Sequence, residues 1–67
     1  MPKGIVKWYN SNRGFGFICP DDGSEVLFAD CENVIGSNKE LEEGIMVDYE
    51  VEVNSRGKQA LDIHKGN

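Results

Sequence analysis

The segment RGFGFI, residues 13–18, restricts the possible folds more than any other part of the chain. Successive side chains of a β-strand point to opposite faces, so Phe15 and Phe17 share one face and the two glycines share the other with Ile18. If Ile18 points into the core, both rings point outward. Small inward residues are typical of a sharply bent strand in a small barrel. The alternative interpretation places both rings in the core and treats the glycines as turn residues.

Short β-rich segments separated by turn sequences make up most of the chain. The turns are SNRG, PDDG and SRGK, in which glycine and proline supply the backbone angles that a reversal needs. A polar stretch, residues 32–44, is predicted to be a long connection with a helical turn near residues 39–43. The pattern indicates an all-β fold, a small five-stranded antiparallel barrel or sandwich. The predicted strands are GIVKWYN (4–10), GFGFI (14–18), EVLFADC (25–31), IMVDYEVEVN (45–54) and ALDIH (60–64).

The alternating segments already supply enough apolar side chains for a small core. Two additional phenylalanine rings would overpack a narrow interior, at a cost of about 1–3 kcal/mol for each misfit. This favours outward rings at Phe15 and Phe17. The predicted inward residues are Val6, Ile18, Leu27, Ala29, Val47, Tyr49, Val51, Leu61 and Ile63.

Trp8 and Phe28 are candidates for the same outer surface as Phe15 and Phe17. Aromatic rings on adjacent strands form a platform on which nucleobases of any identity stack, at about 1–3 kcal/mol per base. The platform therefore predicts a site for single-stranded nucleic acid.

The charges are unevenly distributed along the chain. Twelve acidic residues against seven basic ones give a formal net charge of −5, which by itself disfavours a polyanionic partner. The acidic residues, however, concentrate at 21–25, 40–43 and 48–52. Basic residues interleaved with aromatic ones predict a locally positive surface. Five of the seven cations lie near the first two predicted strands or the last turn: Lys3, Lys7, Arg13, Arg56 and Lys58.

A chain of 67 residues is expected to form one domain, covering residues 1–67. Such a chain buries only about 60% of its unfolded surface, which leaves little structure for the walls of an active site. We therefore expect a binding module and no enzyme, without cofactor, metal or small-molecule substrate. No segment has the length of a membrane span, so a cytoplasmic protein is expected. Cys19 and Cys31 are interpreted as reduced thiols on neighbouring strands, close enough to approach each other.

The segments KGIVKWYN, RGFGFICPDDGS and VLFAD, followed by LEEG and RGKQA, resemble the bacterial cold-shock proteins over essentially the whole length. Members of that family are five-stranded OB-type barrels that bind single-stranded RNA and DNA. The resemblance implies a single cold-shock domain that acts as an RNA chaperone or regulator of gene expression in the cold or stress response. By this resemblance, residues at the matching positions contact nucleic acid: Lys7, Trp8, Arg13, Phe15, Phe17, Phe28 and Arg56. Lys58, in the same last turn as Arg56, and Asp30 complete the predicted site.

Three positions depart from the pattern of the family. Asp30 occupies the position of a histidine, Cys31 that of a second aromatic residue, and Asn38 that of an aromatic residue in a slightly shorter loop. Loss of two stacking rings would weaken binding by about 2–6 kcal/mol if the rings act additively, which makes this range an upper bound. We therefore expect a site that covers fewer nucleotides and binds them more weakly.

The alternative hypothesis is a cold-shock-like barrel that has become a protein-interaction module, with the exposed rings as its apolar patch. The sequence leaves open whether the barrel is a monomer or a strand-exchanged dimer. The shortened loop around Asn38 is the candidate hinge for such an exchange.

Overall fold

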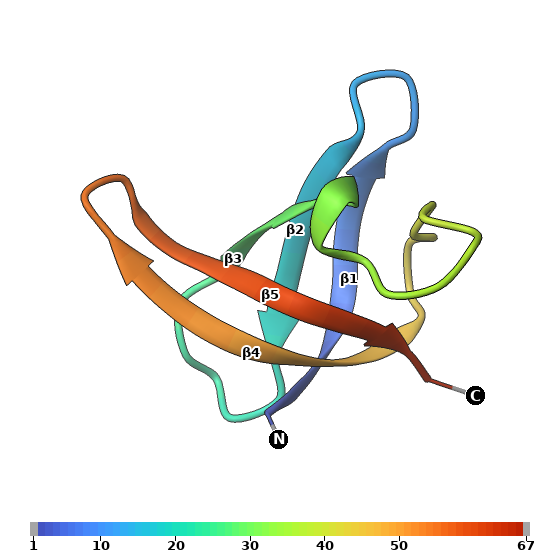
Figure 1. The fold of residues 1–67 in the computed structure, drawn as a ribbon. Helices are drawn as coiled ribbons and strands as arrows, with labels where there is room; N and C mark the ends of the chain where they lie inside the picture. Colours follow the sequence, from blue (N-terminus) through green and yellow to red (C-terminus); the bar gives the residue numbers. More distant parts are fainter. Residues whose placement is uncertain (1, 67) are drawn as a thin grey trace.

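The structure, a computed structural model, describes residues 2–66. Five strands close into a barrel in the order β1-β2-β3-β5-β4 (Figure 1). Its one short helical element is a 3-10 turn, η1, and no described helix has the length and apolar character needed to cross a bilayer. The elements are β1 (Lys3–Asn10), β2 (Phe15–Pro20), β3 (Leu27–Asp30), η1 (Cys31–Asn33), β4 (Met46–Asn54) and β5 (Gly57–Lys65). The predicted all-β, five-stranded barrel of OB type is confirmed.

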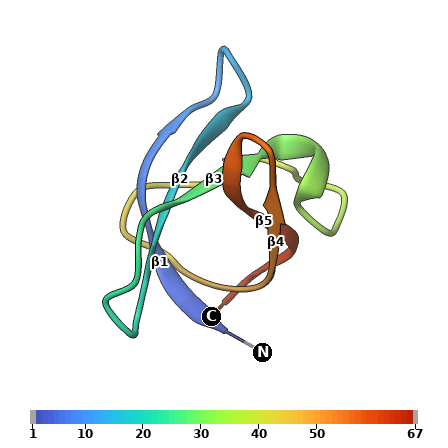
Figure 2. The same ribbon diagram turned by 90° about the vertical axis from the view of Figure 1, so that its left-hand side faces the viewer.

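The sheet is mixed, whereas the sequence predicted an antiparallel one. β3 and β5 pair in parallel, and the other neighbouring strands pair antiparallel. A parallel pair needs a long crossover between its strands, which here consists of η1, the following loop and β4. The predicted helical turn at 39–43 is also wrong, because the helical turn lies at η1. The β1–β2 and β4–β5 loops project beyond the barrel (Figures 1 and 2).

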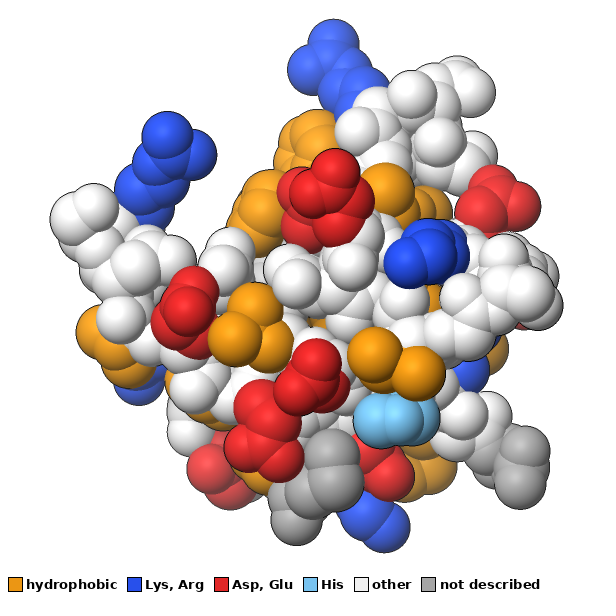
Figure 3. Space-filling model, in the orientation of Figure 1, with side chains coloured by type: hydrophobic (Ala, Val, Ile, Leu, Met, Phe, Trp, Pro, Cys, Tyr) orange, Lys and Arg blue, Asp and Glu red, His pale blue; other side chains and the backbone are white. Residues whose placement is uncertain are grey.

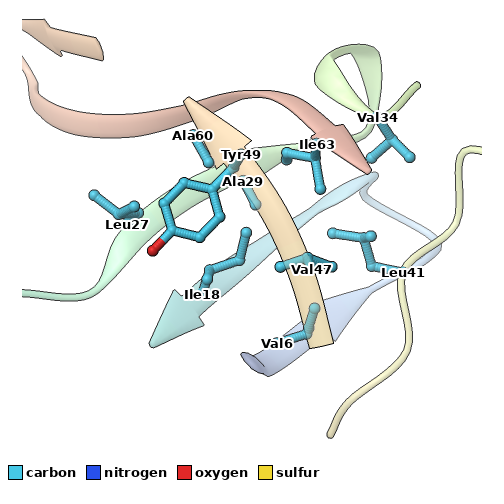
Figure 4. Close-up of a cluster of buried hydrophobic side chains, with 10 residues drawn as sticks. All are labelled: Val6, Ile18, Leu27, Ala29, Val34, Leu41, Val47, Tyr49, Ala60 and Ile63. Carbon is cyan, nitrogen blue, oxygen red and sulfur yellow. The ribbon is translucent and has the colours of Figure 1, made fainter. Parts of the chain in front are cut away.

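The barrel interior is filled by aliphatic side chains around Tyr49 (Figure 4). Most of the predicted inward residues are buried there, and the Tyr49 hydroxyl donates a hydrogen bond to the Lys3 carbonyl oxygen at 3.2 Å. Val34 and Leu41, from the connection between β3 and β4, were missed because they lie in no predicted strand. The buried set is Val6, Ile18, Leu27, Ala29, Val34, Leu41, Val47, Tyr49, Ala60 and Ile63.

Leu61 was predicted to point inward, which is wrong; Val51 shares the inner face of the sheet with its partner Ala60, but it is not buried as expected. Leu61 pairs with Glu50 on the outer face, because a register shift in the β4–β5 ladder breaks the alternation of β5. The shift coincides with a positive φ of 49° at Asp62. The inward residue before this bulge is therefore Ala60. Val51 is 44% exposed, since the β4–β5 hairpin extends beyond the barrel.

The two cysteines are free thiols, but they do not lie near each other as expected. Cys19 pairs with Ile5 near the end of β2, whereas the Cys31 backbone N–H donates to the Gly14 carbonyl oxygen just before β2 begins. Gly14 and Cys19 are five positions apart along extended chain, which corresponds to about 16 Å.

Candidate nucleic-acid interface

Phe15 and Phe17 point away from the barrel interior, because their strand neighbours Gly16 and Ile18 are buried. Phe17 is 36% exposed and Trp8 is 39% exposed, which is unusual for rings of this size in a small domain. Phe15 is half-buried among its neighbouring rings. The outward orientation on which the predicted platform depends is therefore present.

Gly16 allows β1 to approach β2 closely beneath these rings. A Cβ atom at this position would overlap the Trp8 carbonyl oxygen and would lie 2.7 Å from the Tyr9 Cα. No side chain larger than hydrogen fits there without moving the backbone. The glycine between the two phenylalanines thus holds the aromatic strands together.

Trp8 reaches the outer surface through a β-bulge in β1. Strict alternation would put Trp8 on the inner face with Val6, two residues earlier. The register instead shifts between them, so that Val6 pairs with Ile18 and Trp8 pairs with Phe17. The extra residue is Lys7, and the bulge directs the indole to the same face as the Phe17 ring.

The four outward rings form one connected aromatic platform from β1, β2 and β3. Trp8 and Phe17 are stacked with centroids 6.0 Å apart, and Phe15 and Phe28 are stacked at 5.6 Å. Edge-to-face contacts link these two pairs at 5.6 to 6.4 Å. Such geometries are favourable for aromatic pairs, so the rings support one another in a partly exposed position.

Arg13 and Arg56 stand on the two loops that project beyond the platform. In the β1–β2 loop, the Asn10 side-chain oxygen accepts hydrogen bonds from the Asn12 and Arg13 backbone N–H groups at 3.0 and 3.1 Å. In the β4–β5 loop, the Asn54 side-chain oxygen accepts one from the Arg56 N–H at 2.9 Å. Basic side chains stand at the ends of both loops, with hydrophobic ones between them (Figure 3).

The structure separates the basic residues that the sequence grouped together. Lys58 lines a groove of about 460 Å³ with Phe17, Phe28 and Arg56. The pKa of Asp22 is lowered mainly by hydrogen bonds from Ser24, and Lys58 adds a small contribution, so the ammonium group also acts near this carboxylate. Lys7 is exposed at the bulge beside Trp8.

Lys3 pairs with Asp48 at the opposite end of β1, away from the rings. Val26 and Val53 also line the groove beside Phe17, and sequence reasoning did not assign them to the site. Their positions depend on how the hairpin folds over β3, for which local sequence carries no signal.

Asp30 lies directly opposite Phe15 in the β2–β3 ladder, on the same outer face. Its side-chain oxygen accepts a hydrogen bond from the Glu32 backbone N–H at 3.0 Å and thereby caps η1. The carboxylate therefore has a structural role at the edge of the platform, in addition to its negative charge.

The aromatic surface ends beyond Phe15. Cys31 presents its sulfur beside Gly14, and Asn38 faces a separate hollow of about 440 Å³. Three glutamates, Glu40, Glu42 and Glu43, line this hollow together with Asn38. Tyr9 also lines this hollow. The pKa of Tyr9 is raised, mainly by burial and to a smaller extent by the nearby Cys31, Glu40 and Asp30. Neither Cys31 nor Asn38 adds a stacking ring.

Comparison with known proteins gives consistent results along the whole chain. Residues 2–65 match the family profile described as the 'Cold-shock' DNA-binding domain. The chain is 44% identical over 64 residues to the probable cold shock protein A of Mycolicibacterium smegmatis, covering 94% of this chain and 96% of that protein. It is 46% identical over 66 residues to the major cold shock protein of Streptococcus pyogenes serotype M6, with 97% of each chain covered.

The fold also resembles a solved structure of low sequence identity. The Drosophila Unr CSD456 structure superposes with a TM-score of 0.81 at 21% identity, covering 98% of this chain and 26% of that one. This similarity supports the barrel architecture alone.

Proposed function

Because the chain belongs to the cold-shock domain family, a family of nucleic-acid-binding proteins, we propose that it binds single-stranded RNA and DNA on the aromatic platform. The observation that carries the proposal is the contact of four outward rings between two loops that bear arginines. Exposed rings of this kind offer flat faces to unpaired bases.

Binding would combine base stacking with loose phosphate contacts. Trp8, Phe15, Phe17 and Phe28 would each accept a base, at about 1–3 kcal/mol per base and with little sequence preference. Lys7, Arg13, Arg56 and Lys58 would contact phosphates. With three to five such contacts, the slope of log affinity against log salt should be about −2 to −3.5.

Such binding would make the protein an RNA chaperone rather than an enzyme. Bases held on the platform are unavailable for pairing, so misfolded hairpins lose their competing pairs without any bond being made or broken. The site would cover few nucleotides, because Asp30, Cys31 and Asn38 add no ring beyond Phe15. The cytoplasmic location and the oligomeric state stay predictions.

Quenching of Trp8 fluorescence by oligouridine of graded length tests the proposal, because Trp8 is the single tryptophan and lies on the platform. We expect saturable quenching at low salt. The affinity should stop increasing once the oligonucleotide is longer than a few nucleotides. Phe17→Ala and Phe28→Ala should each weaken binding by about 1–3 kcal/mol, roughly five- to 150-fold. Met46→Ala is the matched control, because it truncates a 47% exposed apolar side chain at the start of β4, where Met46 pairs with Ile5. Folded protein that shows no quenching would overturn the proposal.

A second candidate function is a protein-interaction module. Ile5 and Met46 pair across β1 and β4 and are 41% and 47% exposed, which gives an apolar patch separate from the rings. Nuclease-resistant capture of a partner that Met46→Ala abolishes and Phe17→Ala leaves intact would support this function. Partners released by nuclease would favour the nucleic-acid proposal.

A further inference from the structure

The second half of β4 lies at an open edge of the sheet. β1 pairs with β4 at residues 46–48, and the last backbone hydrogen bond on that side runs from the Tyr49 N–H to the Pro2 carbonyl oxygen at 3.1 Å. Within residues 2–66, the segment 51–54 pairs only with β5. This segment belongs to the hairpin that extends beyond the barrel (Figure 1), so one side of its backbone has no neighbouring strand.

The backbone groups of Val51 and Val53 point toward this open edge. Successive residues of a strand direct their N–H and C=O groups to opposite sides, so these two valines share the direction of the Tyr49 N–H, which points toward β1. The backbone of Glu52 points the other way, toward its partner Gln59 on β5. Two N–H donors and two carbonyl acceptors therefore face the position that a further strand would occupy.

The two faces of this edge differ in their chemistry. Val51 and Val53 are 44% and 71% exposed, and they point to the same face of the sheet as Tyr49. Glu50 and Glu52 point to the opposite face, where acidic side chains gather over this part of β4 (Figure 3). The edge thus presents exposed apolar side chains on one face and carboxylates on the other.

A hollow beside Val51 would receive an apolar side chain of an added strand. Its volume is about 140 Å³, and Tyr49 and Leu27 from the barrel interior form part of its lining. The rest of the lining consists of Pro2, Pro20, Asp22, Ser24, Glu25 and Lys58. Two carboxylates against one ammonium group leave the rim of the hollow negative.

We propose that this edge binds an extended protein segment in which basic and apolar residues alternate, by adding it to the sheet as a further strand. Main-chain hydrogen bonds to Val51 and Val53 would supply affinity, and alternate side chains would supply specificity. The basic residues would lie on the face of Glu50 and Glu52, and the apolar ones would cover the two valines. The inference goes beyond the proposed function, because this edge lies outside the aromatic platform.

The carboxylates disfavour two other occupants. A second copy of β4 added antiparallel would bring its own Glu50 and Glu52 to the same face, where like charges opposite each other destabilise the pair. A nucleic-acid strand would bring its phosphates to the same carboxylates, which repel them. Charge complementarity therefore favours a cationic partner, in agreement with the formal net charge of −5.

The probe is a capped peptide of about seven residues in which lysine and valine alternate, added to the isotope-labelled protein. We expect the Val51 and Val53 amide signals to shift in NMR spectra and to exchange more slowly with solvent, because both amides gain hydrogen bonds. The Glu52 amide, which faces β5, should change little. Quenching of Trp8 fluorescence by oligouridine should be the same with and without the peptide.

Changes to the peptide separate strand addition from unspecific attraction between charges. A peptide with glutamate in place of lysine should bind at least roughly tenfold more weakly, because its carboxylates would face those of β4. A lysine peptide methylated at the backbone nitrogens that would donate to β4 keeps every charge. It should protect neither valine amide, since it cannot form the ladder.

Changes to the protein test the two halves of the proposal. Glu50→Gln combined with Glu52→Gln should weaken binding of the lysine peptide roughly two- to thirtyfold, with a smaller effect at high salt. Glu40→Gln combined with Glu42→Gln removes the same charge from the hollow beside Tyr9 and is the matched control, which should leave the affinity nearly unchanged.

Val53→Pro removes one N–H from the open edge without removing a hydrogen bond to β5. It should abolish the protection that the lysine peptide gives to the Val51 amide, while the β4–β5 ladder keeps its slow exchange.

Unchanged Val51 and Val53 amides in folded protein with the lysine peptide would overturn the inference, as would equal binding of the glutamate peptide. Protection of these amides that grows with protein concentration in the absence of peptide would identify a second copy as the occupant and would also overturn it. Loss of oligouridine quenching on addition of the peptide would place the peptide on the platform, against the inference. Failure of oligouridine to quench Trp8 in the absence of peptide would instead contradict the proposed function.

Discussion

Replacing Asp30 by asparagine should tighten binding of single-stranded nucleic acid. The carboxylate lies directly opposite Phe15 at the edge of the platform, where a strand stacked on the rings would bring its phosphates. At about 8 Å in water, the repulsion between a phosphate and a carboxylate is about 0.5 kcal/mol. Half-burial of Asp30 lowers the local dielectric, so we expect about 0.5–1 kcal/mol, or about two- to fivefold tighter binding.

Two substitutions at this position separate its charge from its capping role. Asparagine keeps the side-chain oxygen that accepts the Glu32 N–H, so Asp30→Asn should leave the free energy of unfolding nearly unchanged. Asp30→Ala removes the charge and the acceptor together. It should bind as Asp30→Asn does but lose about 0.5–1.5 kcal/mol of stability.

Titrations of Trp8 fluorescence at several salt concentrations and urea unfolding of the same variants supply these values. The gain in affinity should shrink as salt is added, because counterions screen the carboxylate. Asp21→Asn, in the turn at the far end of β2, removes an equal charge away from the rings and serves as the control. If Asp30→Asn gains no more affinity than Asp21→Asn, the assignment of Asp30 to the binding surface is refuted.

Further predictions concern stability. Gly16→Ala should lower the free energy of unfolding by at least about 1–3 kcal/mol in urea, because its Cβ would overlap the Trp8 carbonyl oxygen; an unchanged midpoint would contradict the close approach. Burial, with smaller contributions from two aspartates, raises the pKa of Tyr49 above 10.0, so the stability that Tyr49 contributes is present below pH 10 and is lost as the pH rises through the raised pKa. In thermal melts, the Tyr49→Phe variant should therefore lose less stability at alkaline pH than the unchanged protein does. The Lys65 ammonium donates to two backbone carbonyl oxygens of the loop before β4, at 2.7 and 3.0 Å, so Lys65→Met should speed amide exchange in that loop while the β1–β2 ladder keeps its protection.

The regular alternation within single strands was sufficient to predict much of the barrel. The inward side of β2 and β3 follows from the period of two, which assigns Ile18, Leu27 and Ala29 to the core. The outward direction of Phe15 and Phe17 follows from the same rule, since the glycine between them had to face inward. The rings that were predicted to gather on one surface do lie in contact.

Alternation failed where a strand contains an extra residue. The bulge at Lys7 and the irregularity at Asp62 each change which side chains face inward, and neither leaves a clear mark in the local sequence. The burial of Val34 and Leu41 likewise depends on how the connection after β3 closes over the barrel end. The position of a bulge depends on how the whole sheet closes into a barrel. The hydrophobic periodicity of a single strand carries no information about that closure.

The sequence by itself therefore determined the β-class, the spacing of the strands and the outward rings of β2, because these depend on the two-residue period of a single strand. Only the tertiary structure decided that a bulge in β1 turns Trp8 toward those rings and that β3 pairs in parallel with β5. Both depend on the pairing and register of the strands, which are set by the packing of the closed barrel as a whole.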